Sequence, residues 1–136
     1  MDITTKNAAQ PIGQYPHAKR VGNLLFLSGI GPRTIDNNIP QLELDHNGRY
    51  INFNFEAQVH SVFANIKAIL VASGSSMEQL VDVTVFLVNI ERDFVLFNAI
   101  YAIYFPYNQP CRTTVEINKL PTPIAIELKC IATIDS

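Results

Sequence analysis

The stretch Pro110–Lys129, PCRTTVEINKLPTPIAIELK, predicts two β-strands joined by a proline-rich turn. Residues 112–117 alternate and are rich in β-branched side chains, which favours a strand. Residues 120–123 contain two prolines and cannot continue a hydrogen-bonded ladder, because proline has no amide donor. The alternation resumes at residues 124–134, where one face is apolar. That face carries Ile126, Leu128, Cys130, Ala132 and Ile134.

Two charged residues in this stretch have unusual positions. Arg112 opens the first strand, and Glu127 lies inside the apolar run of the second. A guanidinium offers a planar fork of donors that fits a carboxylate. A half-buried glutamate can have its pKa raised and transfer protons near neutral pH. The residue types alone leave three interpretations open: a catalytic pair, an internal ion pair, or two solvated surface charges.

The composition predicts a single domain over residues 1–136. Of all residues 48% are hydrophobic, and only 16% are charged, so we expect part of the apolar surface to be buried between subunits. The net charge of −2 and a pI near 5.8 predict no affinity for nucleic acid or for anionic membranes.

The expected location is the cytoplasm. The N-terminus has no apolar region typical of a signal peptide, and no apolar stretch approaches the length of a membrane span. The two cysteines, Cys111 and Cys130, lack CxxC spacing and are expected to be reduced.

Periodicity in the N-terminal half predicts a hairpin and a helix. Residues 1–10 are polar and are expected to be partly disordered. Residues 21–23 predict a hairpin turn, after which residues 24–28 form a short apolar strand. From Phe55 the apolar spacing is that of a helix, with Gln58 and Asn65 expected off its apolar face.

The C-terminal half adds a strand and a second helix. Gly74 is expected to end the first helix, and residues 75–78 carry a capping-box spacing that predicts a further short turn. Residues 80–88 are nearly all apolar and predict a central strand covered on both faces. An aromatic-rich helix follows and ends at Pro106. The whole order predicts an α+β fold, with a mixed sheet and both helices packed on one face.

Most kinds of catalytic centre lack their signature in this chain. The three histidines fall in separate segments, so no metal site is expected. No Walker A or GxGxxG motif is present, and nothing resembles GxSxG, so we expect no cofactor and no serine triad. The residues that remain can hold a small carboxylate substrate and position a water. They are Tyr15, the strand end Ser28-Gly29, Arg112 and Glu127.

These residues are also where the chain resembles the RidA (YjgF/YER057c/UK114) family of enamine/imine deaminases, from about residue 11 to residue 134. The matching segments are Pro11–Tyr15, Leu27–Gly29, Asn65–Leu70, Gly74–Ser76, Val83–Leu87, Tyr101–Pro106, Pro110–Glu116 and Ile126–Leu128. The resemblance implies a chorismate-mutase-like α+β fold and no cofactor. It also implies a homotrimer whose sites lie in the clefts between subunits. Such an assembly would bury the apolar surface that the composition predicts.

Within this family the chain is most similar to 2-aminomuconate deaminases. The segments that carry this similarity are Ser28–Arg33, Val62–Lys67, Leu80–Leu87, Arg112–Asn118 and Leu120–Lys129. Thr114 stands where general members commonly have cysteine, and Gln14 where they commonly have proline. The expected reaction is hydrolysis of 2-aminomuconate to its 2-oxo dicarboxylate and ammonia.

The resemblance implies a role for each site residue. Arg112 binds the substrate α-carboxylate. Glu127 deprotonates the water or passes a proton to the leaving nitrogen. Tyr15 lines the pocket, and Thr114 adds a hydroxyl contact. The strand end that includes Ser28, Gly29 and Ile30 seats the substrate.

A second carboxylate on the substrate needs a separate donor. Arg33 is our candidate, because it directly follows the Ser28–Pro32 strand end. The alternative is a solvated loop arginine, and His17 is a weaker second candidate.

Two other functions remain open. One is a general RidA deaminase that acts on 2-iminobutanoate and 2-iminopropanoate. The other is a non-catalytic ligand-binding or RNA-acting member. The acidic pI counts against RNA, and the presence of both Arg112 and Glu127 counts against a purely structural role.

Overall fold

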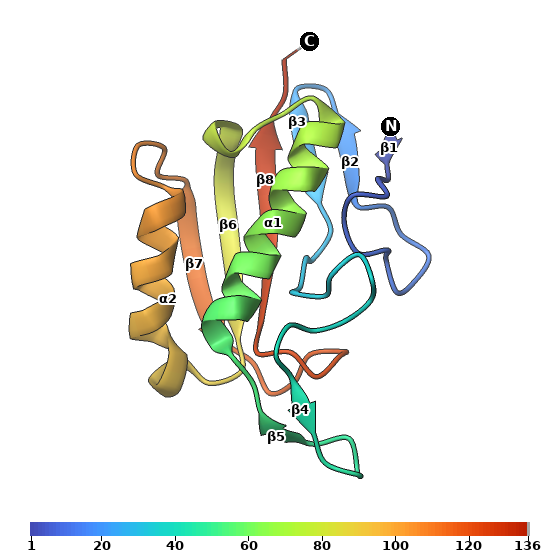
Figure 1. The fold of residues 1–136 in the computed structure, drawn as a ribbon. Coiled ribbons are helices and arrows are strands. Elements are labelled where there is room, and N and C mark those ends of the chain that lie inside the picture. The colour runs from blue at the N-terminus through green and yellow to red at the C-terminus, as the bar shows by residue number, and fades with distance from the viewer. Residues whose placement is uncertain (136) are drawn as a thin grey trace.

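A computed structural model of the protein describes residues 1–135, apart from the side chains of Tyr50 and Ile51. A six-stranded mixed sheet carries two helices on one face, as the sequence predicts (Figure 1). The order of its strands is β1 (Asp2–Ile3), β2 (Ala18–Val21), β3 (Leu24–Leu27), β8 (Ile126–Thr133), β6 (Leu80–Leu87) and β7 (Cys111–Glu116). The helices are α1 (Phe55–Ser73) and α2 (Ile90–Tyr104), with a 3-10 turn η1 (Met77–Gln79), and a separate hairpin pairs β4 (Glu43–Leu44) with β5 (Tyr50–Asn52).

The last two strands of the chain, β7 and β8, do not pair with each other. β6 lies between β7 and β8, pairing parallel with β7 and antiparallel with β8. The crossover through α2 carries β7 to the far side of β6, and the proline-rich segment then passes across the end of β6. There Ile117 donates its amide to Leu87, and Val88 donates its amide to Ala125.

Local signals fix the helix ends. Asn54 and Asn89 cap the N-termini of α1 and α2, each accepting an amide hydrogen three residues on. Gly74 adopts a left-handed conformation with φ 82° directly after α1, which confirms the predicted helix end.

The short turn predicted after Gly74 is present as η1, but the side-chain hydrogen bonds of a capping box do not form. The hydroxyl of Ser75 donates to the carbonyl of Thr133, and Ser76 precedes η1 without a side-chain cap bond. The Ser75 hydroxyl therefore bonds to a carbonyl of β8, far away in the sequence, and not to the nearby backbone that a helix cap would use.

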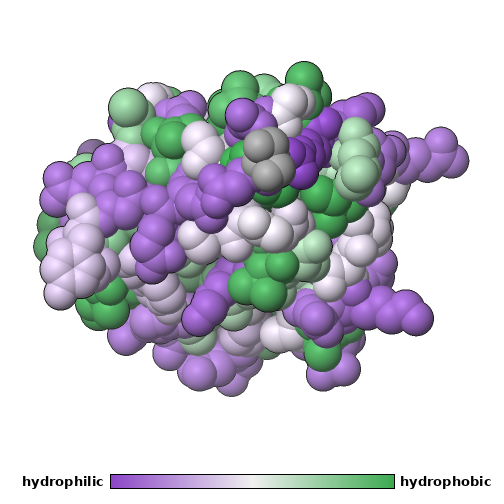
Figure 2. Space-filling model, turned by 90° about the horizontal axis from the view of Figure 1, so that it is seen from above, coloured by the Kyte–Doolittle hydropathy of each residue, from purple (hydrophilic) through white to green (hydrophobic). Residues whose placement is uncertain are grey.

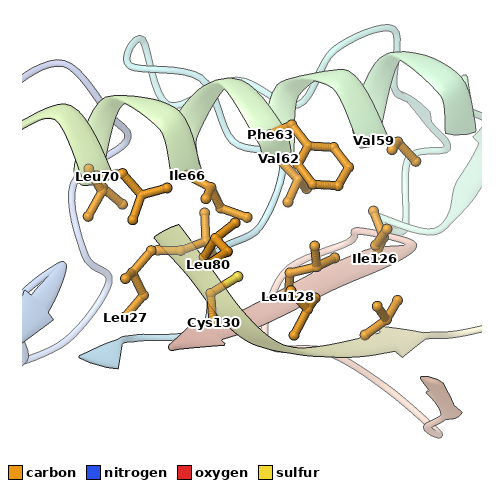
Figure 3. Close-up of a cluster of buried hydrophobic side chains, with 14 of the residues drawn as sticks. Leu27, Val59, Val62, Phe63, Ile66, Leu70, Leu80, Ile126, Leu128 and Cys130 are labelled. Carbon is orange, nitrogen blue, oxygen red and sulfur yellow. The ribbon is translucent and has the colours of Figure 1, made fainter. Parts of the chain in front are cut away.

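The core lies between α1 and the sheet face below it (Figure 3). From α1 it contains Val59, Val62, Phe63, Ile66 and Leu70, and from the strands it contains Leu27, Leu80, Ile126, Leu128 and Cys130. The polar side chains Gln58 and Asn65 are also buried, with 0% and 6% of their surface exposed, so the prediction that they lie off the buried face is wrong.

Within residues 1–135, neither helix lies on the second face of the sheet. The prediction that β6 is covered on both faces is therefore wrong for a single chain, because Val81 is 41% exposed and Thr84 and Phe86 are only partly buried. At the end of the molecule that carries both termini, hydrophobic residues also reach the surface among hydrophilic ones (Figure 2).

Residues 1–10, which the composition predicts to be partly disordered, run along the edge of the sheet. β1 pairs with β2, Ala8 is buried, and the amide of Thr5 donates to Nδ1 of His17. In the described part of the chain, neither helix has the length and apolarity that crossing a bilayer requires.

Candidate active site

Glu127 lies on the open face of the sheet. Its neighbours in β8, Ile126 and Leu128, point into the core, so the alternation of the strand directs Glu127 the other way. Its partner across the strand pair is Phe86. Partial burial raises the pKa of Glu127 above that of an ordinary glutamate, because the charged form loses hydration.

The strand end after β3 brings a glycine against this carboxylate. Ile30 exchanges two backbone hydrogen bonds with Leu128, of 2.7 and 3.0 Å, and so holds the segment alongside β8. A Cβ added at Gly29 would lie 2.7 Å from Oε2 of Glu127 and 2.9 Å from its Cδ. The Glu127 carboxyl therefore occupies the space that any side chain at position 29 would need. Because both backbone groups of Ile30 are already bonded, they are not free to bind a substrate.

Several predicted site residues meet in a shallow depression around this carboxyl, which we call the Glu127 depression. It is lined by Ile12, Tyr15, Gly29, Gly31, Arg33, Pro121, Thr122, Ile124 and Glu127. An adjoining depression shares Tyr15, Gly29, Gly31 and Arg33 and adds Ser28, Ile30 and His17. The Ser28 hydroxyl donates to the carbonyl of Pro16, which fixes the strand end.

Arg33 is held at the edge of both depressions. Its guanidinium donates to the carbonyl of Gln10 and to Oδ1 of Asn37. An arginine side chain has five N–H donors, so these two bonds leave about three for a ligand. His17 is less available: it is buried, and its ring nitrogens contact the amide of Thr5 and the carbonyl of Ala9.

Arg112 lies on the opposite face of the sheet from Glu127. Val83 of β6 pairs with both Arg112 and the core residue Cys130, so the arginine shares the helix-covered face. The geometry therefore excludes an ion pair between Arg112 and Glu127 within one chain. The guanidinium donates to Oδ1 of Asn98 at 2.8 Å and lies 4.8 Å from the ring centroid of Tyr101.

Thr114 follows on the same face as Arg112. Its hydroxyl oxygen is buried and has no hydrogen-bond partner among residues 1–135, and the same holds for the Tyr101 hydroxyl. Burial raises the pKa of Tyr101 to about 12, although the nearby Arg112 acts to lower it. Nothing in the sequence distinguishes Asn98 or Tyr101 from the other residues of an aromatic-rich helix.

The charged side chains of the site do not form a metal centre. Across the described residues, no three His, Cys, Asp or Glu side chains converge. Both cysteines are free, with Cys111 exposed and Cys130 buried. Burial raises the pKa of Cys130 to about 12, so its thiol is not an activated nucleophile.

Comparisons with known proteins give consistent results. The sequence profile of the family described as "Endoribonuclease L-PSP" matches residues 5–134. A RutC family protein of Pyrococcus horikoshii is 38% identical over 133 residues, which are 96% of this chain and 94% of the relative. The chloroplastic Reactive Intermediate Deaminase A of Arabidopsis thaliana is 35% identical over 132 residues, covering 97% of this chain and 65% of the relative.

Solved structures share the fold along almost the whole chain. The crystal structure of the yeast protein YEO7 has a TM-score of 0.87 and 32% sequence identity, covering 99% of this chain and 98% of that one. The E. coli protein TdcF, crystallised with bound serine, has a TM-score of 0.85 and 27% identity, covering 99% of both chains.

Proposed function

Since the chain belongs to the RidA/YjgF/L-PSP family, we propose that it is a cofactor-independent deaminase that hydrolyses enamines or imines of small carboxylates. The observation that carries this proposal is the Glu127 depression, where a carboxyl of raised pKa lies against a glycine and an arginine forms part of the same lining. An iminium carbon is already electrophilic, so the protein has only to hold the carboxylate, position a water and move protons.

Glu127 acts as the proton carrier. In its ionised form it accepts a proton from water while the water oxygen bonds to the carbon of the iminium ion, whose π electrons pass to nitrogen, giving a carbinolamine. The carboxylic acid then returns this proton to the nitrogen. The carbon–nitrogen bond breaks with its electron pair on nitrogen, ammonia leaves, and the hydroxyl gives its proton to the Glu127 carboxylate as the 2-oxo acid forms. A raised pKa suits both steps, because it makes the carboxylate a stronger base toward water and keeps the acid form available at a higher pH.

Arg112 supplies the α-carboxylate contact from a second copy of the chain. One chain cannot bring Arg112 and Glu127 into one cleft, because they lie on opposite faces of the sheet. A ring of identical subunits can, since in a head-to-tail interface different surfaces of each copy meet. We therefore propose a homotrimer whose open sheet faces are buried between subunits, with each site shared by two of them. A stable monomer in light scattering at micromolar concentration would exclude this assembly.

The proposed substrate is 2-aminomuconate, a dicarboxylate. Its α-carboxylate would bind Arg112 of one copy, and its second carboxylate would bind Arg33 beside Glu127. The alternative is a general deaminase of 2-iminobutanoate and 2-iminopropanoate, which have a single carboxylate. The serine seen in TdcF, also a small α-carboxylate, is compatible with either.

The decisive experiment compares the two substrates in one buffer. We expect kcat/KM for 2-aminomuconate to exceed that for 2-iminobutanoate. The reverse order would favour the general deaminase, and no ammonia release from either substrate would refute the proposed reaction. Two free cysteines fit a reducing compartment, and we place the protein in the cytoplasm.

RNA cleavage is the second candidate function, because the family's description names an endoribonuclease. The net charge of −2 gives no electrostatic attraction to a phosphate backbone. This function would be supported over deamination if the purified protein cleaved RNA and Glu127→Gln abolished the cleavage.

A further inference from the structure

Three polar side chains on α1 form a stripe that faces backbone segments beside the Glu127 depression. Gln58, Ser61 and Asn65 lie at helical spacings of three and four residues, and so on one side of the helix. Gln58 and Asn65 are almost fully buried. Burying an amide side chain is unfavourable unless it is hydrogen-bonded, so its partners indicate what the residue does.

The stripe binds three consecutive carbonyl groups of the strand end after β3. The hydroxyl of Ser61 donates to Pro32 O at 2.7 Å. Nδ2 of Asn65 donates to Gly31 O at 3.0 Å and to Arg33 O at 2.7 Å. One helix face therefore fixes the backbone of the segment Gly31–Arg33 from a single side.

This arrangement determines where the Arg33 amide points. The peptide bonds are trans, and in a trans peptide the N–H is directed opposite to the carbonyl of the preceding residue. Because Pro32 O faces Ser61, the N–H of Arg33 is directed away from α1. That N–H has no acceptor within the described chain, and about three guanidinium N–H groups are also unused. Arg33 thus offers backbone and side-chain donors together, a combination that suits a carboxylate.

Gln58 acts on the other wall of the Glu127 depression. Its Oε1 accepts the amide hydrogen of Ala125 at 2.9 Å, two residues before Glu127. The same helix face therefore fixes both walls, but through different side chains.

We infer that Ser61 and Asn65 are positioning residues that make the site selective for substrates with a second carboxylate, by holding Arg33 as its receptor. Gln58 positions the wall that carries Glu127 and serves every substrate equally. This inference rests on the proposed deaminase function and on its proposed dicarboxylate substrate.

The test compares selectivity among α1 variants. Ser61→Ala and Asn65→Ala should each lower the ratio of kcat/KM for 2-aminomuconate to that for 2-iminobutanoate about ten-fold, the size of one lost charge-assisted contact. Gln58→Met should lower both values and leave the ratio unchanged. Ser73→Ala is the matched control, because its hydroxyl donates only within α1, to Ile69 O. An unchanged ratio in both Ser61→Ala and Asn65→Ala would overturn the inference.

A binding measurement separates this inference from the proposed reaction. Calorimetry with hexanedioate and hexanoate, which need no turnover, should show wild-type preference for the dicarboxylate and its loss in both variants. If the wild type releases no ammonia but shows this pattern, the reaction is wrong and the carboxylate receptor stands. Equal affinity of the wild type for the two acids would overturn the proposal that Arg33 binds a second carboxylate. Should Asn65→Ala fail to fold in circular dichroism, Ser61→Ala, which removes one hydroxyl, decides the question.

Discussion

Substituting Gly29 with alanine tests how closely the Glu127 carboxyl must be placed. The new Cβ would lie 2.7 Å from Oε2, and ordinary contacts begin near 3.4 Å, so the carboxyl must move by about 0.7 Å. A displacement of about 1 Å can cost roughly 10²-fold in rate. We therefore expect kcat/KM to fall about 10- to 10²-fold, which corresponds to about 1.4–2.7 kcal/mol of transition-state stabilisation.

The fold should tolerate this change. Gly29 does not have a left-handed φ, and the clash is with the mobile end of a side chain and not with backbone. We expect the midpoint of thermal unfolding to stay within a few degrees of the wild-type value, since alanine also restricts the unfolded chain.

A double-mutant cycle shows whether the loss passes through Glu127. Glu127→Ala removes the clashing atoms, so in that background Gly29→Ala should cause no further loss of kcat/KM. The rate of ammonia release, measured with enzyme in excess, compares the wild type, the two single variants and the double variant. Equal losses in both backgrounds, or an unaffected single variant, would refute the close placement of the carboxyl against Gly29.

Four further predictions concern three charged residues. Arg112→Lys should keep the fold but lose most activity, because lysine lacks the bidentate geometry worth roughly 1.5–3 kcal/mol; unchanged kcat/KM would remove its role. Glu127→Gln should bind a carboxylate ligand but turn over about 10²–10⁴-fold more slowly, and near wild-type turnover would place the base elsewhere. Since burial raises the pKa of Glu127, ionising this carboxyl disfavours the folded state. The free energy of unfolding of Glu127→Gln should therefore rise relative to that of the wild type as pH increases through the raised pKa. Denaturant titrations should show this difference disappear below the ordinary carboxyl pKa. Arg33→Ala should raise KM for 2-aminomuconate about ten-fold or more and spare a monocarboxylate imine at the same ionic strength; equal losses on both would make Arg33 structural.

The local structure could be predicted from the sequence because its causes are local. Alternation, helical spacing and Gly74 identified most of the strands, the two helices and a helix end. The neighbours of β7 and β8 could not be predicted in this way, because strand order depends on the crossover through α2.

The site was only partly predictable for the same reason. Gly29, Arg33 and Glu127 do meet in one depression. The separation of Arg112 from Glu127 follows from their register against β6, which a single strand pattern does not contain. Asn65 was predicted off the buried face because its acceptors, the carbonyls of Gly31 and Arg33, lie more than thirty residues earlier in the chain.

The measurement that tests the shared site most directly mixes two inactive variants. Arg112→Ala and Glu127→Gln are unfolded together in equal amounts, refolded, and assayed for ammonia release, with subunit exchange verified by native mass spectrometry of differently tagged chains. If each site takes Arg112 from one copy and Glu127 from another, random assembly leaves about a quarter of the sites with both residues, so about a quarter of wild-type activity should return. Activity no higher than that of the separate variants, in oligomers shown to be mixed, would contradict the shared site.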